Sequence, residues 1–160
     1  MRSALFALFT MAAFASEGIP YLKPSFLNLK EEVQEAKKEG KTLIIMFHRD
    51  GCPACERLRE TMKEKQVVDY FKPRFNLIQV DILSSSELTA PDGKKTTEKG
   101  FSQSMGVRAT PMLIFYDQNG TVALTLAGPL DSKTLLSAGK FVAEGYYKTK
   151  SFTQFLKDSK

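Results

Sequence analysis

Apolar residues gather along this chain in short runs that predict strands. Residues 42–47 show no alternation of apolar and polar positions, which is typical of a strand in the middle of a sheet with helices on both faces. Residues 75–82 predict a second strand and residues 111–116 a third. Turn-forming residues at 117–120, followed by residues 121–126, predict that the third strand closes a hairpin with a fourth.

Helical periodicity fills the stretches between these predicted strands. From residue 26 to residue 39, apolar residues recur at helical spacing, with Ser25 as the expected cap and Gly40 as the expected stop. The apolar positions of this helix are Phe26, Leu29, Val33 and Ala36. Further helices are expected at residues 53–63, 67–71, 97–105, 132–147 and 152–156.

The order of these elements predicts an α/β fold with a central mixed sheet of four to five strands flanked by helices. Strands separated by helices are expected to pair in parallel through crossovers, and the closing hairpin adds an antiparallel edge. Residues 84–100 are polar and contain turn chemistry, so we expect an exposed insertion there. A chain of 160 residues with 42% hydrophobic content suits one domain with its own core.

The first 15 residues have the pattern of a secretory signal peptide. Arg2 precedes an apolar run at residues 4–14, and Ala13 and Ala15 fit a cleavage site before Ser16. An apolar run of this length is too short to span a bilayer, which needs about 20 residues. We therefore expect a signal peptide at residues 1–15, a mature domain at residues 16–160, a periplasmic location and no stable membrane insertion after cleavage.

The charge of the chain points to no particular partner. The formal net charge is +5, and the lysines are spread along the chain rather than gathered with aromatic residues in one strip. This distribution is typical of a solvated basic surface. We expect no nucleic-acid partner.

Chemistry concentrates at Cys52 and Cys55, the only cysteines, which lie between the first predicted strand and the helix at residues 53–63. Cys52 is placed at the helix N-terminus, where free N–H groups and the helix dipole favour a thiolate, so Cys52 is the candidate nucleophile. Pro53 suits the first helical position. A structural disulfide is the alternative, but a ring of about four residues stabilises by only about 2 kcal/mol. This spacing in a strand-to-helix context favours redox chemistry.

Together with Thr110 and Pro111 at the start of the third predicted strand, this cysteine pair makes the chain resemble thioredoxin-fold proteins over nearly its whole mature length. Within that superfamily the chain is similar to exported thioredoxins of the SoxW type, which are found with bacterial sulfur-oxidation proteins. The motifs that carry this closer resemblance are Gly-Cys-Pro-Ala-Cys at 51–55, Val-Asp-Ile at 80–82, Asp-Gly at 92–93, Gly-Val-Arg-Ala-Thr-Pro at 106–111, and the C-terminal Phe-Val-Ala-Glu-Gly-Tyr-Tyr and Ser-Phe-Thr-Gln-Phe-Leu.

The resemblance implies a thioredoxin-like three-layer fold and a thiol–disulfide oxidoreductase that needs no cofactor. In such an enzyme Cys52 attacks and Cys55 resolves the mixed disulfide. Pro111 is expected to be a cis proline facing the cysteines, and the Thr110 backbone to bind a substrate chain alongside Pro53 and Ala54. The implied partners are protein or small-molecule thiols and disulfides, including sulfur carriers, with a membrane thiol transporter as electron donor.

The chain also departs from cytosolic thioredoxins near the cysteines. It contains no tryptophan, so Gly51 stands where those proteins usually have one, and Met46 replaces their buried acid. Removal of the proton from Cys55 therefore needs another group or water. His48, Arg49 and Glu56 are the candidate modulators of the two thiols.

Two other functions remain open on the sequence. A metal-binding or docking module would use His48, Cys52 and Cys55 as ligands for copper(I) or zinc. A closed zinc site needs four ligands and the chain supplies three, so we expect no metal. A disulfide oxidase or isomerase is the other alternative, although Pro53-Ala54 lacks the histidine that DsbA-like oxidants have between their cysteines, which favours a reductant.

Overall fold

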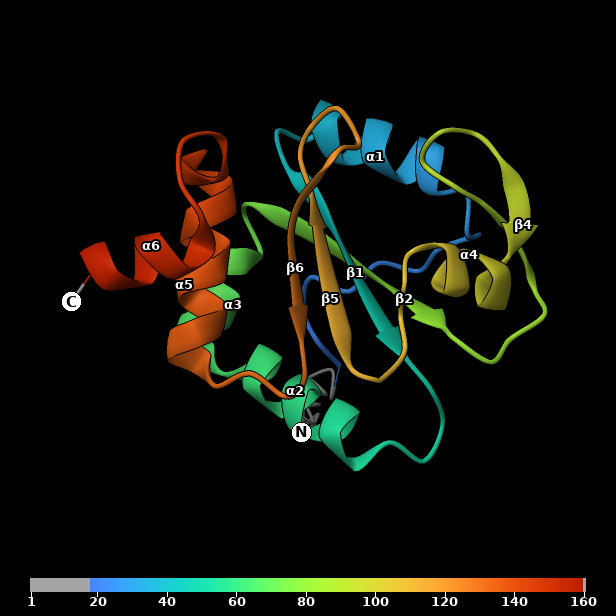
Figure 1. The fold of residues 1–160 in the computed structure, drawn as a ribbon, viewed down its shortest axis with the longest axis horizontal. Coiled ribbons are helices and arrows are strands. Elements are labelled where there is room, and N and C mark those ends of the chain that lie inside the picture. Colours follow the sequence, from blue (N-terminus) through green and yellow to red (C-terminus); the bar gives the residue numbers. More distant parts are fainter. Residues whose placement is uncertain (1–17, 160) are drawn as a thin grey trace, which may run out of the picture.

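A four-stranded mixed sheet runs through the computed structural model, which describes residues 18–159 (Figure 1). Its strands lie in the order β2-β1-β5-β6. β1 pairs in parallel with β2 and antiparallel with β5, which in turn pairs antiparallel with β6. The strand bounds are Thr42–His48 for β1, Phe75–Asp81 for β2, Met112–Tyr116 for β5 and Val122–Ala127 for β6.

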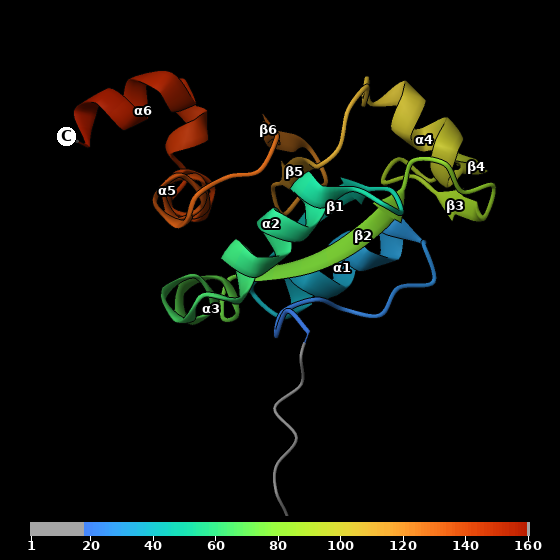
Figure 2. The same ribbon diagram turned by 90° about the horizontal axis from the view of Figure 1, so that it is seen from below.

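Helices cover both faces of this sheet, which gives three layers (Figure 2). On one face lie α2 (Pro53–Lys63), α3 (Lys65–Phe71) and α5 (Ser132–Ala143). On the other face lie α1 (Leu29–Lys38) and α4 (Glu98–Ser104). After α5 come a short 3-10 helix (Tyr146–Lys148) and α6 (Phe152–Asp158), which packs on α5. The predicted thioredoxin-like three-layer fold with a mixed sheet is confirmed.

Side chains of β1 divide the core into its two halves. Ile44 and Met46 face the α2 side, whereas Ile45 and Phe47 face the α1 side, as the alternation of a strand requires. All four side chains are fully buried. The prediction of a strand covered on both faces is therefore confirmed, and β1 leads directly from the core to the cysteine pair.

The direction of β5 corrects the sequence-based expectation. A helix between β2 and β5 predicted parallel pairing, but β5 runs antiparallel to β1, with Met112 opposite Phe47. The physical reason is length, because seven helical residues of α4 extend only about 10 Å, whereas a seven-residue strand extends about 23 Å. α4 therefore does not carry the chain back to the other end of the strands, and β5 starts at the same end of the sheet at which β2 ends.

The segment predicted as an exposed insertion is more ordered than expected. It contains a hairpin of β3 (Glu87–Thr89) and β4 (Lys95–Thr97), and α4 begins directly after it. Leu88 and Ala90 are buried in the core half beneath α1 and α4. Two apolar side chains among many polar ones give no clear period, so the sequence pattern did not reveal this hairpin.

Two helix ends also differ from expectation. α1 begins at Leu29 with Asn28 as its cap, because the Leu27 carbonyl accepts a hydrogen bond from Thr89 N–H at 2.8 Å and holds the preceding backbone outside the helix. Phe26, predicted to face the core, is fully exposed. α5 ends at Ala143 instead of near residue 147, because Gly145 adopts a left-handed conformation with φ of 77°.

Two features of the chain concern membranes and export. None of the helices within residues 18–159 is long and apolar enough to cross a membrane. The predicted signal peptide at residues 1–15 lies outside the described residues, so it stays a prediction.

Close packing of α5 on α3 yields a stability prediction. A Cβ atom at Gly139 would lie 2.8 Å from Cε2 of Phe71, inside the core. Alanine favours a helix by up to about 1 kcal/mol over glycine, but overpacking a core typically costs about 1–3 kcal/mol. We expect Gly139→Ala to lower the free energy of unfolding in urea, whereas Lys140→Ala at the neighbouring exposed position should change it by less than about 0.5 kcal/mol. An increase in stability for Gly139→Ala would contradict this packing.

Candidate active site

Cys52 lies where the chain leaves β1 and enters α2, and its side chain caps that helix. Its sulfur accepts a hydrogen bond from Cys55 N–H at 3.2 Å, and Pro53 occupies the first turn, where its missing N–H costs nothing. Free N–H groups and the helix dipole therefore act directly on the Cys52 sulfur. This contact stabilises negative charge there when the pair is reduced.

The two cysteines form a disulfide, with their Cα atoms 5.2 Å apart. Cys52 is 6% exposed, whereas Cys55 is completely buried. Of the two cysteines, only Cys52 can therefore be reached by another molecule, and its role as the attacking cysteine stays a prediction. Pro53 is exposed and Ala54 half-buried, so both lie at the rim around this sulfur.

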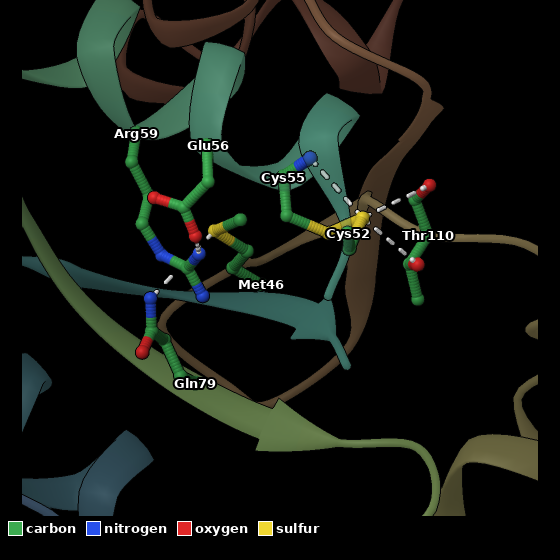
Figure 3. The surroundings of a disulfide bond; sticks show 7 residues. All are labelled: Met46, Cys52, Cys55, Glu56, Arg59, Gln79 and Thr110. Carbon is green, nitrogen blue, oxygen red and sulfur yellow. Dashed lines mark hydrogen bonds and ion pairs between the residues drawn. A yellow bond between two sulfur atoms is a disulfide. The ribbon is translucent and has the colours of Figure 1, made fainter. Parts of the chain in front are cut away.

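Thr110 faces the Cys52 sulfur from the loop before β5 (Figure 3). Its hydroxyl oxygen lies 3.3 Å from Cys52 Sγ and its carbonyl oxygen 3.7 Å away. The peptide bond between Thr110 and Pro111 is cis, and Pro111 is buried. In the reduced protein the Thr110 hydroxyl can donate a hydrogen bond to a Cys52 thiolate, a contact that the sequence did not predict.

Met46 forms the floor of the site on the side of the disulfide away from Thr110 (Figure 3). Its side chain is fully buried, and its sulfur lies 3.9 Å from the side-chain amide nitrogen of Gln79 on β2. Glu56 and Arg59 of α2 form an ion pair close to this methionine. A thioether accepts no proton, so the site differs chemically from one with a buried carboxylate.

His48 ends β1 and lies opposite Asp81 in the register of β1 and β2. Burial lowers the pKa of its imidazole, and the Arg59 charge lowers it further, while Asp81, Glu98 and Asp50 act in the opposite direction. His48 is therefore mainly neutral at pH 7 and adds little positive charge near Cys52. Arg49, the next residue, is exposed.

The structure thus brings together most of the residues that the sequence selected. Thr110 contacts the Cys52 sulfur, Pro53 follows Cys52 at the start of α2, and Glu56 pairs with Arg59 in the same helix. The placement of Pro111 against the cysteines stays a prediction. Arg59 was missed, although it follows Cys55 by one helical turn. Gln79 was missed because its position beneath the site depends on strand register, which no local pattern reveals. The catalytic and substrate-binding roles of these residues stay predictions.

The ligand set for a metal does not assemble from these residues. Within residues 18–159, no group of three His, Cys, Asp or Glu side chains is placed to hold a metal ion. His48, Cys52 and Cys55 would have to rearrange to bind copper or zinc together.

Comparisons with known proteins agree with this geometry. The model of the thioredoxin-like domain matches residues 29–143. A thioredoxin-fold protein from Helicobacter pylori superposes with a TM-score of 0.65 at 23% identity, over 80% of this chain and 92% of that one. A candidate disulphide-isomerase from Bacteroides thetaiotaomicron gives 0.58 at 26% identity, over 78% and 92% of the chains. A DsbH oxidoreductase gives 0.58 at 15% identity, over 88% and 95%. No curated protein sequence matches significantly.

The environment of His48 predicts a pH dependence of stability. Because its pKa is lower in the folded protein than in the unfolded chain, the unfolded chain binds the extra proton more readily. The free energy of unfolding should therefore fall as the pH drops below about 7 and continue to fall through the unfolded value of about 6.5. Urea titrations between about pH 5.5 and 7.5, a range above the usual carboxylate pKa values, should show a weaker dependence for His48→Gln than for the wild type. Parallel curves would contradict the assignment.

Proposed function

Because the chain belongs to the family of thioredoxin-like domains and is a thiol–disulfide oxidoreductase, we propose that it works outside the cytoplasm as a reductant of disulfides. The observation that carries this proposal is the Cys52–Cys55 disulfide at the start of α2, with the Cys52 sulfur alone reachable and Thr110 beside it. Its substrates are disulfides in proteins or in small sulfur carriers.

The reaction begins from the reduced protein. The Cys52 thiolate attacks one sulfur of the substrate disulfide, a mixed disulfide forms, and the departing substrate thiolate takes up a proton. The Cys55 thiol then loses its proton and attacks Cys52 Sγ, which releases the second substrate thiol and closes the Cys52–Cys55 disulfide. Two electrons and two protons pass from the protein to the substrate.

The local residues assist different steps of this exchange. The N-terminus of α2 stabilises the Cys52 thiolate before attack, and the Thr110 hydroxyl lies close enough to donate to the same sulfur. The exposed rim at Pro53 lets a substrate chain approach. Cys55, buried beneath Cys52, is held where it can attack only the Cys52 sulfur.

The direction of electron flow and the location rest on the sequence. Pro53-Ala54 contains no histidine between the cysteines, unlike DsbA-like oxidants, and this supports a reductant. The signal-peptide pattern of residues 1–15 supports export to the periplasm. A reductant in that oxidising compartment needs a supply of electrons, so we propose a membrane thiol transporter as its donor and a SoxW-type role with sulfur-carrying partners.

The first test of this proposal distinguishes the role of Cys52 from that of Cys55. Wild-type protein with dithiothreitol should reduce insulin faster than dithiothreitol alone, and Cys55→Ser should accumulate a mixed disulfide through Cys52, because the resolving thiol is gone. Cys52→Ser should form no such adduct. Mass spectrometry of the trapped species and insulin turbidity measure the two effects. Wild-type activity in the double serine variant would refute the proposal.

A second measurement decides between a reductant and an oxidant. We expect the reduction potential of the Cys52–Cys55 pair, equilibrated with glutathione or dithiothreitol buffers, to lie closer to about −270 mV, the value of thioredoxin, than to about −120 mV, that of DsbA. A value near the second figure would identify an oxidase. Intermediate values, near about −180 mV, are those of a disulfide isomerase.

A further inference from the structure

α2 carries a positive charge on the same face as Cys55. Arg59 follows Cys55 by four residues within this helix, and side chains at that spacing are neighbours, with Cβ atoms about 5–6 Å apart. The Arg59 side chain is only 20% exposed, so most of it lies against the protein. Cys55 itself is completely buried. A cation is therefore held close to the thiol that has to lose its proton in the second step of exchange.

The partner of Arg59 in its ion pair is much more exposed. The Glu56 side chain is 66% exposed. Both residues line a hollow of about 210 Å³, together with the mutually paired Glu60 and Lys63. Because water screens an exposed charge more strongly than a partly buried one, Glu56 offsets only part of the Arg59 charge. The side of the ion pair that faces the protein interior is therefore net positive.

Met46 lies between this charge and the cysteine pair. Its sulfur is 3.9 Å from the Gln79 amide nitrogen, and Gln79 lines the same hollow as Arg59. Figure 3 shows the Arg59 guanidinium beside Met46, on the side of the disulfide away from Thr110. Met46 is uncharged and completely buried. Since charges interact more strongly through a protein interior than through water, the Arg59 charge acts on the region that Met46 occupies.

The charge of Arg59 also acts on the end of β1. Burial lowers the pKa of His48, the last residue of that strand, and the positive charge of Arg59 lowers it further. The acidic groups around His48, which are Asp81, Glu98 and Asp50, act in the opposite direction. The influence of Arg59 therefore extends from α2 to the strand that leads into the cysteine pair.

We propose that Arg59 assists the resolving step of exchange by stabilising the thiolate of Cys55. This role rests on the reaction proposed above. Where cytosolic thioredoxins have a buried acid, this protein has Met46, and the cation beside it stabilises the sulfur that loses the proton. Arg59 is a positioning residue, because it acts on the substrate only through Cys55.

The atoms and electrons of this step balance without another reactant. The Cys55 thiol gives its proton to solvent, and the thiolate attacks Cys52 Sγ. The bond between Cys52 Sγ and the substrate sulfur breaks as the Cys52–Cys55 bond forms. The substrate leaves as a thiolate and takes up a proton from solvent, so the charge of Arg59 is needed only while Cys55 is ionised.

The test follows the two steps separately with 4,4′-dithiodipyridine, a small disulfide that is uncharged at neutral pH. Cys52 of the reduced protein releases one thiopyridone and Cys55 releases the second, so stopped-flow absorbance shows two phases. Arg59→Met should slow the second phase about threefold at pH 7 and change the first by less. The loss should disappear at about pH 9, above the usual value for a thiol, because Cys55 then ionises without help.

Matched variants distinguish the charge from the packing of the side chain. Arg59→Lys keeps the charge and should restore most of the rate. Arg57→Met removes the same charge from an exposed position two residues after Cys55, on another face of the helix, and should leave the second phase within about twofold. Glu56→Gln removes the counter-charge and should accelerate the second phase at pH 7.

Several outcomes would overturn this role of Arg59. It is wrong if Arg59→Met resolves the mixed disulfide as fast as the wild type, if its loss of rate is the same at about pH 9 as at pH 7, or if Arg57→Met is equally slow. Urea unfolding of the oxidised proteins checks that each variant folds. If Arg59→Met does not fold, Glu56→Gln decides, and a second phase no faster than that of the wild type rejects the role. A wild-type protein that shows both phases but does not reduce insulin refutes the proposed function alone.

Discussion

The hydrogen bond from Cys55 N–H to the Cys52 sulfur is the contact on which the candidate site depends. It makes the sulfur the cap of α2, so the start of the helix and the reactive atom coincide. That position requires β1 to end there, and β1 is held by β2 on one side, by β5 on the other, and by both halves of the core. The pairing and packing of β1 therefore determine where the Cys52 sulfur lies at the N-terminus of α2.

The two cysteines differ in exposure and in the contacts that they make. Cys52 is reachable and receives the helix dipole and the Thr110 hydroxyl, whereas Cys55 is enclosed by apolar neighbours. Met46 beneath the pair cannot accept a proton. The contacts that stabilise negative charge are thus concentrated at Cys52, and in the proposed exchange the proton of Cys55 has to pass to a group other than Met46.

Elements with local signals were predictable from the sequence. Pro53 marks the start of α2, and a run of apolar residues predicts β1. The structure has both elements at these positions. The direction of β5, the β3–β4 hairpin and the exposure of Phe26 were missed, because each depends on how distant segments meet. A periodic pattern identifies an element but not the neighbour against which it packs.

The residues of the candidate site also differ in whether a local sequence pattern could identify them. Cys52 and Cys55 could be selected from the sequence, because they lie only three residues apart at the start of one predicted helix. Thr110 was selected through a family resemblance, yet the approach of its hydroxyl to the sulfur needed the tertiary structure. The contact of Gln79 with Met46 could not be predicted, because neither strand alone determines the register in which β1 and β2 pair.

The residues around Cys52 also bear on how the protein could distinguish one disulfide from another. Around the Cys52 sulfur the rim consists of Pro53, Ala54 and Thr110, which offer a substrate little beyond backbone contacts and one hydroxyl. Such a rim has few side chains that could tell one disulfide from another, so the proposed exchange depends more on access to the Cys52 sulfur than on side-chain recognition.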